Sequence, residues 1–255
     1  MDFSEIEYEK AGNTAWIKLN RPKVLNAMNR KMWREISAAL SLAEKDPGVR
    51  VLVFTGNGRA FSTGADLKES KTRTPAEYRA YLEGLQEASR RILSFPKPTI
   101  AAVNGYALGS GYELALACDI RIAAETAQIG SPEARVNSSV TGGALRLIQD
   151  LVGPAKAREL LFTAKNIDGA EACRIGLVNK AVPDAELVSE TTTMAEAIAA
   201  NSAFSLKMIK KGLLLAAWEA SLSAVMDFEV EACLACVSTK EREQSLEQFE
   251  HRKEK

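Results

Sequence analysis

Two glutamates in this sequence each follow a stretch of small residues. Glu113 lies in NGYALGSGYELALACD, residues 104–119, and Glu133 lies in IGSPEARV, residues 129–136. They are 20 residues apart, so only a fold can bring them together. Two carboxyl groups at close range can hold one water and move its protons, because the repulsion of like charges raises one pKa and keeps one group protonated near neutral pH. Glu113 could therefore be half of an acid–base pair, and the rest of the chain has to decide.

Each glutamate also has a plainer interpretation. Glu113 could be a charge that complements the dipole at the start of a helix, and Glu133 could be a polar loop residue or cap after Ser131 and Pro132. Taken singly these interpretations are the better ones. The catalytic interpretation depends on what surrounds both residues.

The histidine and cysteine content argues against a catalytic triad and against a metal or redox site. The one histidine, His251, lies in the charged tail, which excludes a Ser-His-Asp triad or a His-rich metal site in the core. Cys233 and Cys236 form a C-x-x-C, but no second pair accompanies them, so we expect a helical face rather than a metal or redox site. We predict no metal, and acid–base chemistry must come from carboxylates, lysine, tyrosine or cysteine.

Two segments combine an apolar strand with a glycine-containing turn. VLVFTGNGRAFSTGAD leads to Ala65 and Asp66, and TIAAVNGYALGSGYE leads to Ser110 and Glu113. Glycine permits close approach of a backbone to a ligand, and the start of a helix leaves N–H groups without partners. Converging, the two turns would supply two donors to an oxyanion. Either turn alone could be an ordinary βα loop, and neither has the spacing of a dinucleotide or phosphate loop.

The elements that must position these turns alternate in type. Strands are expected at residues 14–20, 49–56, 99–103, 119–125 and 127–131, and helices at 28–46 and 75–95. In the first helix Met28, Met32, Ile36, Leu40 and Leu42 fall on or near one face. Beyond about residue 184 only helical patterns follow, with large apolar side chains that include Trp218 and Phe228. We therefore expect an α/β body, residues 1–200, and a helical C-terminal part, residues 201–255, that packs on a partner subunit or over the body.

Bulk composition narrows the class of partner. Lys+Arg and Asp+Glu are both 33, so the net charge is zero, and no run approaches the roughly 18 apolar residues of a membrane span. The charged first residues lack the apolar core of a signal peptide. We predict a cytoplasmic protein with no nucleic-acid or membrane partner.

The two glycine-containing segments also carry a family resemblance. AFSTGADLKE, residues 60–69, and KPTIAAVNGYALGSGYELALACDIRIA, residues 97–123, resemble the signature segments of the crotonase superfamily, typified by enoyl-CoA hydratase. Residues 19–33, 129–136 and 153–183 resemble further family segments, in family order. The resemblance implies a spiral of ββα units, with a helical C-terminal region that assembles a homotrimer or a dimer of trimers.

The resemblance also implies roles for individual residues. The backbone N–H groups of Ala65 and Ser110 would bind the thioester carbonyl of an acyl-CoA, and Glu113 and Glu133 would be the two glutamates of a hydratase. The expected reaction is syn addition of water to a 2-enoyl-CoA. Coenzyme A arrives as part of the substrate, and no separate cofactor is expected.

Contacts to the acyl-CoA are expected from both flanks of the site. Some of these residues have a plainer interpretation than contact with the acyl-CoA. Asp66 could bond the amides of its own turn, and Lys23 and Lys68 could be solvated at the surface. Asp119 is expected to be structural. Tyr78 and Tyr81 are candidates for the acyl wall or for the core of their helix, and Leu82 is the better candidate for the core. Arg252 and Lys253 could reach the coenzyme A of a neighbouring subunit or remain in a solvated tail. The expected contacts are Lys23, Leu25, Ala27, Ala65, Asp66, Leu67, Lys68, Gly109, Tyr78 and Tyr81.

Two departures from the family pattern leave the substrate open. Ser110 stands where many members have glycine, which preserves the donor only if φ and ψ there suit a residue with a Cβ. The run ARVNSSVTGGALRL, residues 134–147, is one residue shorter than in relatives and lacks their proline. Asn137, Ser138 and Ser139 could narrow or polarise the acyl pocket, or could form a turn that faces solvent.

Three other functions, two catalytic and one non-catalytic, remain as alternatives on the same fold. They are an acyl-CoA isomerase, an acyl-CoA hydrolase and a non-catalytic module that binds acyl-CoA or RNA. Isomerases of the family usually keep only one of the two carboxylates, so the presence of both favours the hydratase.

Overall fold

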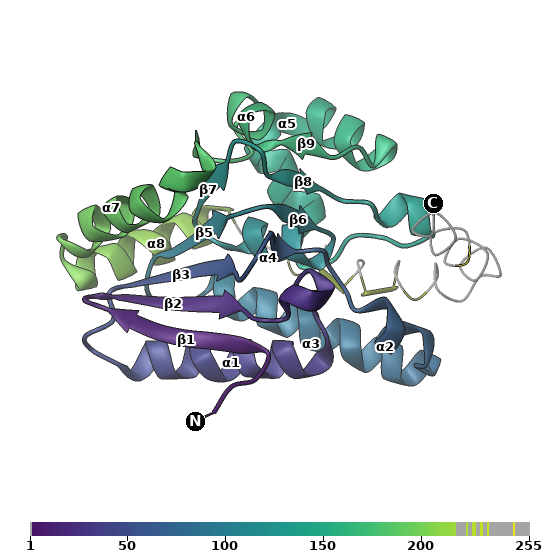
Figure 1. Cartoon of the computed structure of the whole chain (residues 1–255), viewed down its shortest axis with the longest axis horizontal. Coiled ribbons are helices and arrows are strands. Elements are labelled where there is room, and N and C mark those ends of the chain that lie inside the picture. Colours follow the sequence, from purple (N-terminus) through teal and green to yellow (C-terminus); the bar gives the residue numbers. More distant parts are fainter. Residues whose placement is uncertain are drawn as a thin grey trace.

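Two sheets form the frame of the molecule (Figure 1). The computed structural model describes residues 2–217 and the single positions 223, 226, 227, 230, 231, 234 and 247. Within these residues the larger sheet has the order β1-β2-β3-β5-β7-β10 and the smaller one the order β4-β6-β8-β9.

The larger sheet is parallel except at its first edge. Its strands are β1 (Ile6–Ala11), β2 (Thr14–Leu19), β3 (Val51–Gly56), β5 (Thr99–Val103), β7 (Ile120–Ala124) and β10 (Lys180–Val182). Only the β1–β2 pair is antiparallel. Every residue of β5 is buried, as expected of a parallel strand covered on both faces, and this is why the continuous apolar run predicted it well.

The smaller sheet takes the second strand of each repeating unit. It contains β4 (Ala60–Ser62), β6 (Tyr106–Leu108), β8 (Gln128–Gly130) and β9 (Ile167–Asp168), with β9 antiparallel to β8. In the pairs β3–β4, β5–β6 and β7–β8 the first strand joins the larger sheet and the second joins the smaller one. This is the expected spiral of ββα units. Because β4, β6 and β8 are neighbours, the turns that follow them meet at one edge of the smaller sheet.

Helices follow each of these turns. After β4 come α2 (Leu67–Lys71) and α3 (Pro75–Leu93), after β6 comes α4 (Ser110–Ala117), and after β8 come η2 (Glu133–Val136) and α5 (Ala144–Thr163). The helix α5 is broken at Gly153, whose φ is +76°, and Pro154 follows. All residues of α4 are buried, and it packs against α3, α5, β4 and β6. The helix that carries Glu113 is therefore held on every side.

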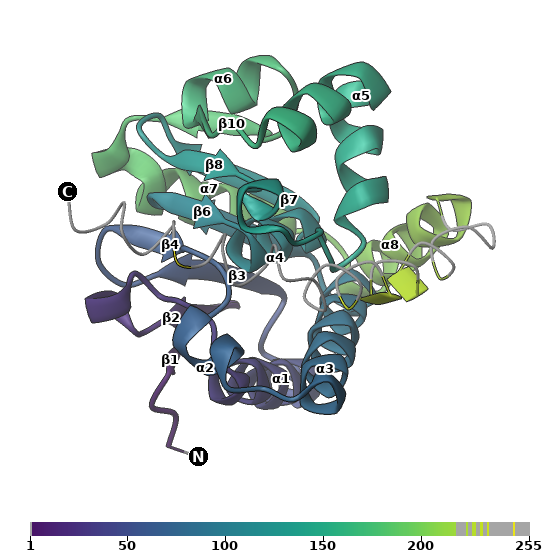
Figure 2. The same ribbon diagram turned by 90° about the vertical axis from the view of Figure 1, so that its right-hand side faces the viewer.

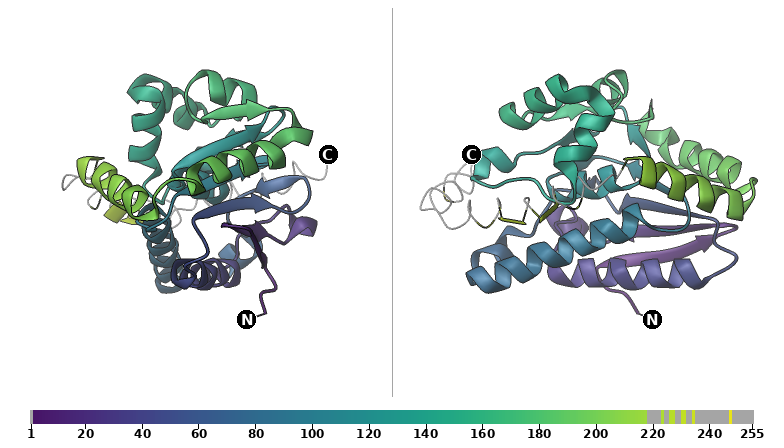
Figure 3. Two further views of the ribbon diagram at one scale, coloured as in Figure 1. Left: turned by 90° about the vertical axis from the view of Figure 1, so that its left-hand side faces the viewer. Right: turned by 180° about the vertical axis from the view of Figure 1, so that it is seen from behind.

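Outer helices cover the sheets. Figure 2 shows α1 (Arg30–Lys45) and α3 on one side of the molecule and α5 and α6 (Gly169–Arg174) on the opposite side. Figure 3 shows α7 (Leu187–Ala199) along the larger sheet, where it contacts β2, β3, β5 and β7. The remaining elements are the short helices η1 (Pro22–Val24) and η3 (Asp184–Glu186), and α8 (Ala203–Ala217).

Two helices show how local sequence sets their bounds. The Thr74 side chain caps α3, Pro75 takes the first helical position, and Glu77 completes a capping box. The helix α1 begins at Arg30 because the Asn29 side chain accepts a hydrogen bond from Met32 N. Leu42 was expected on or near the buried face of α1 but is 39% exposed, because two residues along a helix from Leu40 is a turn of about 200°.

Five strands were not predicted from sequence: β1, β4, β6, β9 and β10. β4 and β6, of three residues each, lie within segments that were expected to be turns. β1 lies in the charged N-terminal segment, and three of its six side chains are exposed, so its apolar pattern is weak. β9 has two residues and β10 has three, both within a segment expected to supply helices. Strands this short depend on their neighbours in the sheet rather than on their own sequence.

The C-terminal part contacts the body at the described positions. Gln86 Nε2 donates to the carbonyl of Met226, and both terminal nitrogens of Arg79 bond Glu231, at 2.8 and 3.0 Å. These contacts favour packing over α3. Expectations that lie outside the described residues are those for the further helices, Trp218, Phe228, Cys233, Cys236, His251, Arg252 and Lys253. Over the described part of the chain, no helix has the length and apolar character needed to cross a membrane.

Candidate active site

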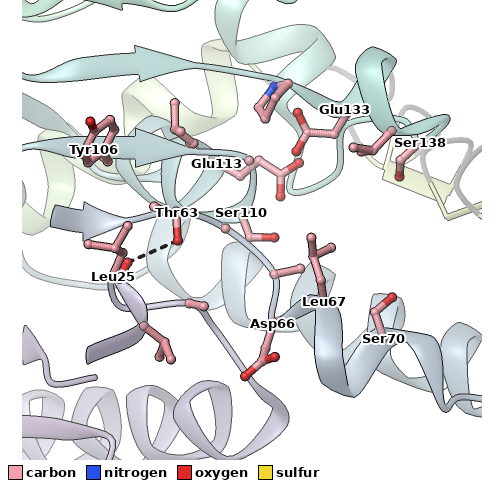
Figure 4. Close-up of a pocket in the computed structure, with 18 of the residues that line it drawn as sticks. Leu25, Thr63, Asp66, Leu67, Ser70, Tyr106, Ser110, Glu113, Glu133 and Ser138 are labelled. Atoms are coloured by element: carbon pink, nitrogen blue, oxygen red, sulfur yellow. Dashed lines mark hydrogen bonds between the residues drawn. The ribbon is translucent and has the colours of Figure 1, made fainter. Parts of the chain in front are cut away.

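One cavity has a volume of about 810 Å³. It is lined by every residue that the sequence predicted to be catalytic, to donate to the thioester carbonyl, or to be an expected contact of the acyl-CoA. It opens at the edge where the turns after β4, β6 and β8 meet (Figure 4). The predicted residues on its lining are Lys23, Leu25, Ala27, Ala65, Asp66, Leu67, Lys68, Tyr78, Tyr81, Gly109, Ser110, Glu113 and Glu133. Segments separated by more than a hundred residues therefore share one pocket.

The N–H of Ala65 is directed by a short bridge to the N-terminal segment. Met28 N donates to Gly64 O at 2.7 Å, and Asp66 N donates to Met28 O at 3.0 Å. In a parallel bridge of this kind the middle residue turns its own N–H away from the partner. In the described part of the chain the N–H of Ala65 donates to no other group.

The N–H of Ser110 is free for a different reason. Ser110 is the first residue of α4, where a backbone N–H has no partner within the helix, and it finds none elsewhere among the described residues. A Cβ added to Gly64 would lie 3.3 Å from Ser110 N, so the two donor segments touch. Both donors therefore belong to one corner of the cavity.

Serine at position 110 is compatible with this geometry. Positive φ values fall on Gly109, at +52°, and on Gly64, at +96°, while Ser110 is not among the residues with positive φ. The unusual turn is thus made by the residue before the donor. The helical conformation of Ser110 accepts a Cβ without strain.

Glu113 is a buried acid one turn into α4. Its side chain is 2% exposed, and its two oxygens accept from Thr141 N at 2.5 Å and from Thr141 Oγ1 at 2.7 Å. Burial raises the pKa of Glu113 above its ordinary value, against the opposing effect of the Thr141 hydrogen bonds and the Ser110 hydroxyl. The group is therefore poised to exchange a proton closer to neutral pH than an exposed glutamate.

Glu133 approaches the same corner from the opposite side. Ser131 donates its hydroxyl to Glu133 Oε2 at 2.5 Å. The other oxygen lies 2.7 Å from where a Cβ on Gly109 would stand, so the carboxyl packs against the turn that precedes Ser110. Figure 4 shows Glu113 and Glu133 reaching into the same part of the cavity above Ser110. Two acids from separate elements thus stand beside two amides that have no partner among the residues the structure describes.

Asp66 performs the structural role that its position suggested. It caps α2 by accepting from Lys68 N at 3.1 Å, and it accepts from Arg21 Nη1 at 2.8 Å. Burial alone would raise the pKa of Asp66, but Arg21 and the α2 amides together hold it below its usual value. Arg21 also bonds Glu5 and the carbonyl of Ala27, and it was not predicted as a site residue.

Asn26 holds the turn that carries Lys23, Leu25 and Ala27. Its side chain is buried, accepts from Arg21 N at 2.8 Å, and donates to the carbonyls of Asn57 and Ala60. Leu25 and Asn26 have φ values of +54° and +56°. Asn tolerates this region better than most residues, which is the signal that could have found it.

The helix α3 supplies the opposite wall. Tyr78, Tyr81, Leu82 and Leu85 are buried on α3 and also line the cavity. A contact between Tyr78 or Tyr81 and an acyl group stays a prediction. The Arg73 guanidinium stacks on the Tyr81 ring, 3.7 Å from its centre. Ser138 and Ser139 lie on the lining as expected, but Asn137 does not; it takes φ +50° where η2 ends.

Two other side chains at the site were missed from sequence. Ser131 and Thr141 donate hydrogen bonds directly to the two acids, yet neither carries a charge or a motif that singles it out.

Asp119 was expected to be structural. It accepts hydrogen bonds from Thr99 N and from Lys210 Nζ, the latter at 2.6 Å. In the portion of the chain described by the structure, no group of three or more His, Cys, Asp or Glu is placed to hold a metal.

The spiral of ββα units and the paired donor turns define the crotonase fold class. A family model described as enoyl-CoA hydratase/isomerase matches residues 9–255, and the chain belongs to this family. The chain is 36% identical to the short-chain-enoyl-CoA hydratase of Clostridium acetobutylicum, over 98% of this chain and 95% of that protein. It is equally similar, at 36%, to the crotonyl-CoA hydratase of Syntrophomonas wolfei, over 98% and 96%.

Solved structures agree with these relatives. The crystal structure of an enoyl-CoA hydratase/isomerase from Xanthobacter autotrophicus Py2 matches with a TM-score of 0.89 and 34% identity. The match covers 94% of this chain and 91% of that one. Both the sequence and the fold therefore align over nearly the whole length.

Proposed function

We propose that this protein is a hydro-lyase that adds water to a 2-enoyl-CoA and gives a 3-hydroxyacyl-CoA, reversibly. The observation that carries the proposal is the meeting of Glu113 and Glu133 beside the unpaired N–H groups of Ala65 and Ser110. The hydratase names of relatives that match over nearly the whole chain support it.

The backbone donors act on the thioester carbonyl. Its oxygen accepts from Ala65 N–H and Ser110 N–H, and the charge on this oxygen grows as water attacks Cβ and an enolate-like anion forms. Donors fixed in advance stabilise that charge more than the ground state, and losing one typically raises a barrier by about 3–4 kcal/mol.

The two carboxyl groups move the protons. The water oxygen forms the bond to Cβ while one carboxylate takes the water's proton, and the other carboxyl gives its proton to Cα. Both carboxyls stand on the same side of the substrate, so the addition is syn. The sum is one water added across one double bond with no net oxidation, and we therefore propose no redox cofactor. Because the two carboxyls move the protons and the backbone donors polarise the carbonyl, we propose no metal either.

Coenzyme A enters as part of the substrate. The cavity that holds the two donors is also lined by Lys23, Leu25, Ala27, Leu67 and Lys68, which supports their proposed role as contacts to the carrier. Tyr78 and Tyr81 are proposed to contact the acyl group. The cytoplasmic location and the absence of nucleic-acid and membrane partners stay predictions of the sequence.

The test is a panel of 2-enoyl-CoA thioesters of different length, assayed by loss of enoyl absorbance. We expect the parent to hydrate at least one member, and Glu113→Gln and Glu133→Gln each to lose at least a hundredfold in kcat. Both variants should still bind a saturated acyl-CoA, because each replacement keeps the shape of the side chain.

A 3-enoyl-CoA added to this panel and an assay for free thiol separate the alternatives. A 3-enoyl-CoA converted without uptake of water would indicate an isomerase, and release of free coenzyme A thiol would indicate a hydrolase. Hydration that continues unimpaired in either variant would contradict the mechanism with two carboxyls.

A further inference from the structure

Thr141 contacts both oxygens of Glu113. It lies in the loop between η2 and α5, where the sequence departs from the family pattern, and it is 4% exposed. Its N–H reaches Oε1 at 2.5 Å and its hydroxyl reaches Oε2 at 2.7 Å. One residue thus controls the orientation of the buried acid.

The loop around Thr141 is tied down on two sides. Thr141 O accepts from Ala144 N at 3.0 Å, and Gly142 N donates to Gln86 Oε1 of α3 at 2.8 Å. Gly142 has φ +65°, and a Cβ there would lie 2.9 Å from Ser89 Oγ, so the loop packs directly on α3. The hydroxyl is therefore held in place while the carboxyl changes its protonation state.

The two hydrogen bonds differ in what they permit. A backbone N–H can only donate, so a proton placed on Oε1 would oppose it. A hydroxyl donates to a carboxylate and, after rotation, accepts from a carboxylic acid. The bond between Thr141 and Oε2 can therefore persist in both states of Glu113, and the proton that Glu113 carries belongs on Oε2.

We propose that the Thr141 hydroxyl is a positioning group for Glu113, which keeps this carboxyl oriented as it gains and loses its proton and assigns that proton to Oε2. The proposal rests on the proposed hydration. It makes Thr141 a residue that acts through Glu113 without touching the substrate's reacting carbons.

Other titratable groups near Glu113 would not imitate this effect. They are Glu133 from η2, Tyr78 and Tyr81 from α3, and Tyr112 on its own helix. Burial raises the pKa values of Tyr81 and Tyr112 well above their ordinary range, so both stay neutral during the assay. Replacing Thr141 changes no charge and leaves all of these groups in place.

The test compares Thr141→Val, which keeps the shape and removes the hydroxyl, with Thr141→Ser, which keeps the hydroxyl and removes the methyl. We expect Thr141→Val to lower kcat about tenfold to a hundredfold, the range of a hydrogen bond to a charged group, with KM changed less than about threefold. The limb of the pH profile governed by Glu113 should move to higher pH, because the lost donor favoured the ionised form. Thr141→Ser should retain most of the kcat and the parent's limb.

Three results would overturn the proposal. They are a parent-like kcat and pH profile in Thr141→Val, equal impairment of the two variants, and a loss of kcat with no movement of the limb. If Thr141→Val does not fold, as judged by its thermal transition, Thr141→Ala takes its place with the same expectations.

An infrared pH titration separates this proposal from the proposed function. The carboxyl band of Glu113 is identified by its absence in Glu113→Gln, and it is followed without substrate. If the parent hydrates no enoyl-CoA, the proposed function fails, and the titration alone decides about Thr141. A higher pKa of Glu113 in Thr141→Val than in the parent supports the positioning role, and an unchanged pKa refutes it.

Discussion

At the scale of single residues, the site depends on one glycine as much as on its acids. Gly109 takes φ +52° and ψ −125°, a conformation that L side chains rarely adopt, and it aims the N–H of Ser110. It also leaves room for Glu133, whose Oε1 would stand 2.7 Å from a Cβ at this position. The donor and the acid therefore share a requirement for the absence of a side chain.

Gly109→Ala should accordingly damage both functions at once. We expect a loss of at least tenfold in kcat and a lower thermal transition, since the methyl adds backbone strain of order 1–3 kcal/mol and displaces Glu133. The matched control is Gly12→Ala, because Gly12 has a similar φ of +57° but nothing within 4 Å of the added methyl. An equal effect of the two changes on kcat would show that strain alone, rather than displacement of Glu133, is responsible.

The residues that sequence reasoning missed share a physical cause. Asn26, Ser131 and Thr141 act through hydrogen bonds to groups that only the fold brings near them. Glu113 and Glu133 could be predicted because the segments that carry them resemble the two catalytic segments of the family. A serine or threonine in a loop has no comparable signal, and its partner decides its role.

At the scale of elements, prediction worked where burial is continuous. β5 and α3 were predicted within about two residues, since an all-apolar run and a capping box are local signals. The expected helix at residues 28–46 and the strand at 49–56 begin two residues later in the structure. The smaller sheet was predicted only at β8, because strands of two or three residues carry too little pattern of their own.

The helix α8 exposes several large apolar side chains. Phe204, Met208, Ile209 and Leu213 are all exposed, and at about 100° per residue they spread over roughly half of the circumference of the helix. An apolar face of this kind in a family member supports the proposed assembly of copies of the chain, a homotrimer or a dimer of trimers. The sequence division at residue 200 falls just before this helix and stays a prediction.

Leu213→Asp should therefore weaken the assembly. In an apolar interface between subunits, the carboxylate created by the change would lose its hydration without gaining an ion-pair partner. We therefore expect the solution mass at micromolar concentration to fall toward that of the single chain, 27.7 kDa. Val188→Asp, at an exposed position on α7, is the control and should leave the mass unchanged. A parent that is already monomeric by light scattering would refute the role given to this face.

At the scale of the whole molecule, the spiral explains why distant segments form one site. Each unit sends its second strand to the smaller sheet, so the turns after β4, β6 and β8 become neighbours. The first turn supplies Ala65, the second supplies Ser110 and Glu113, and the third supplies Glu133. The order of these segments along the chain could be predicted from sequence. Their meeting in space follows from the pairing of β4, β6 and β8, which no local sequence pattern specifies.

The central claim is that two carboxyl groups share one water beside two backbone donors. The most direct measurement is a high-resolution crystal structure of the protein with a saturated, unreactive acyl-CoA. The account predicts the thioester oxygen within hydrogen-bond distance of Ala65 N and Ser110 N, and one water bonded to both Glu113 and Glu133 near Cβ. A thioester oxygen bound elsewhere, or a carboxyl of either glutamate turned away from Cβ with no shared water, would contradict it.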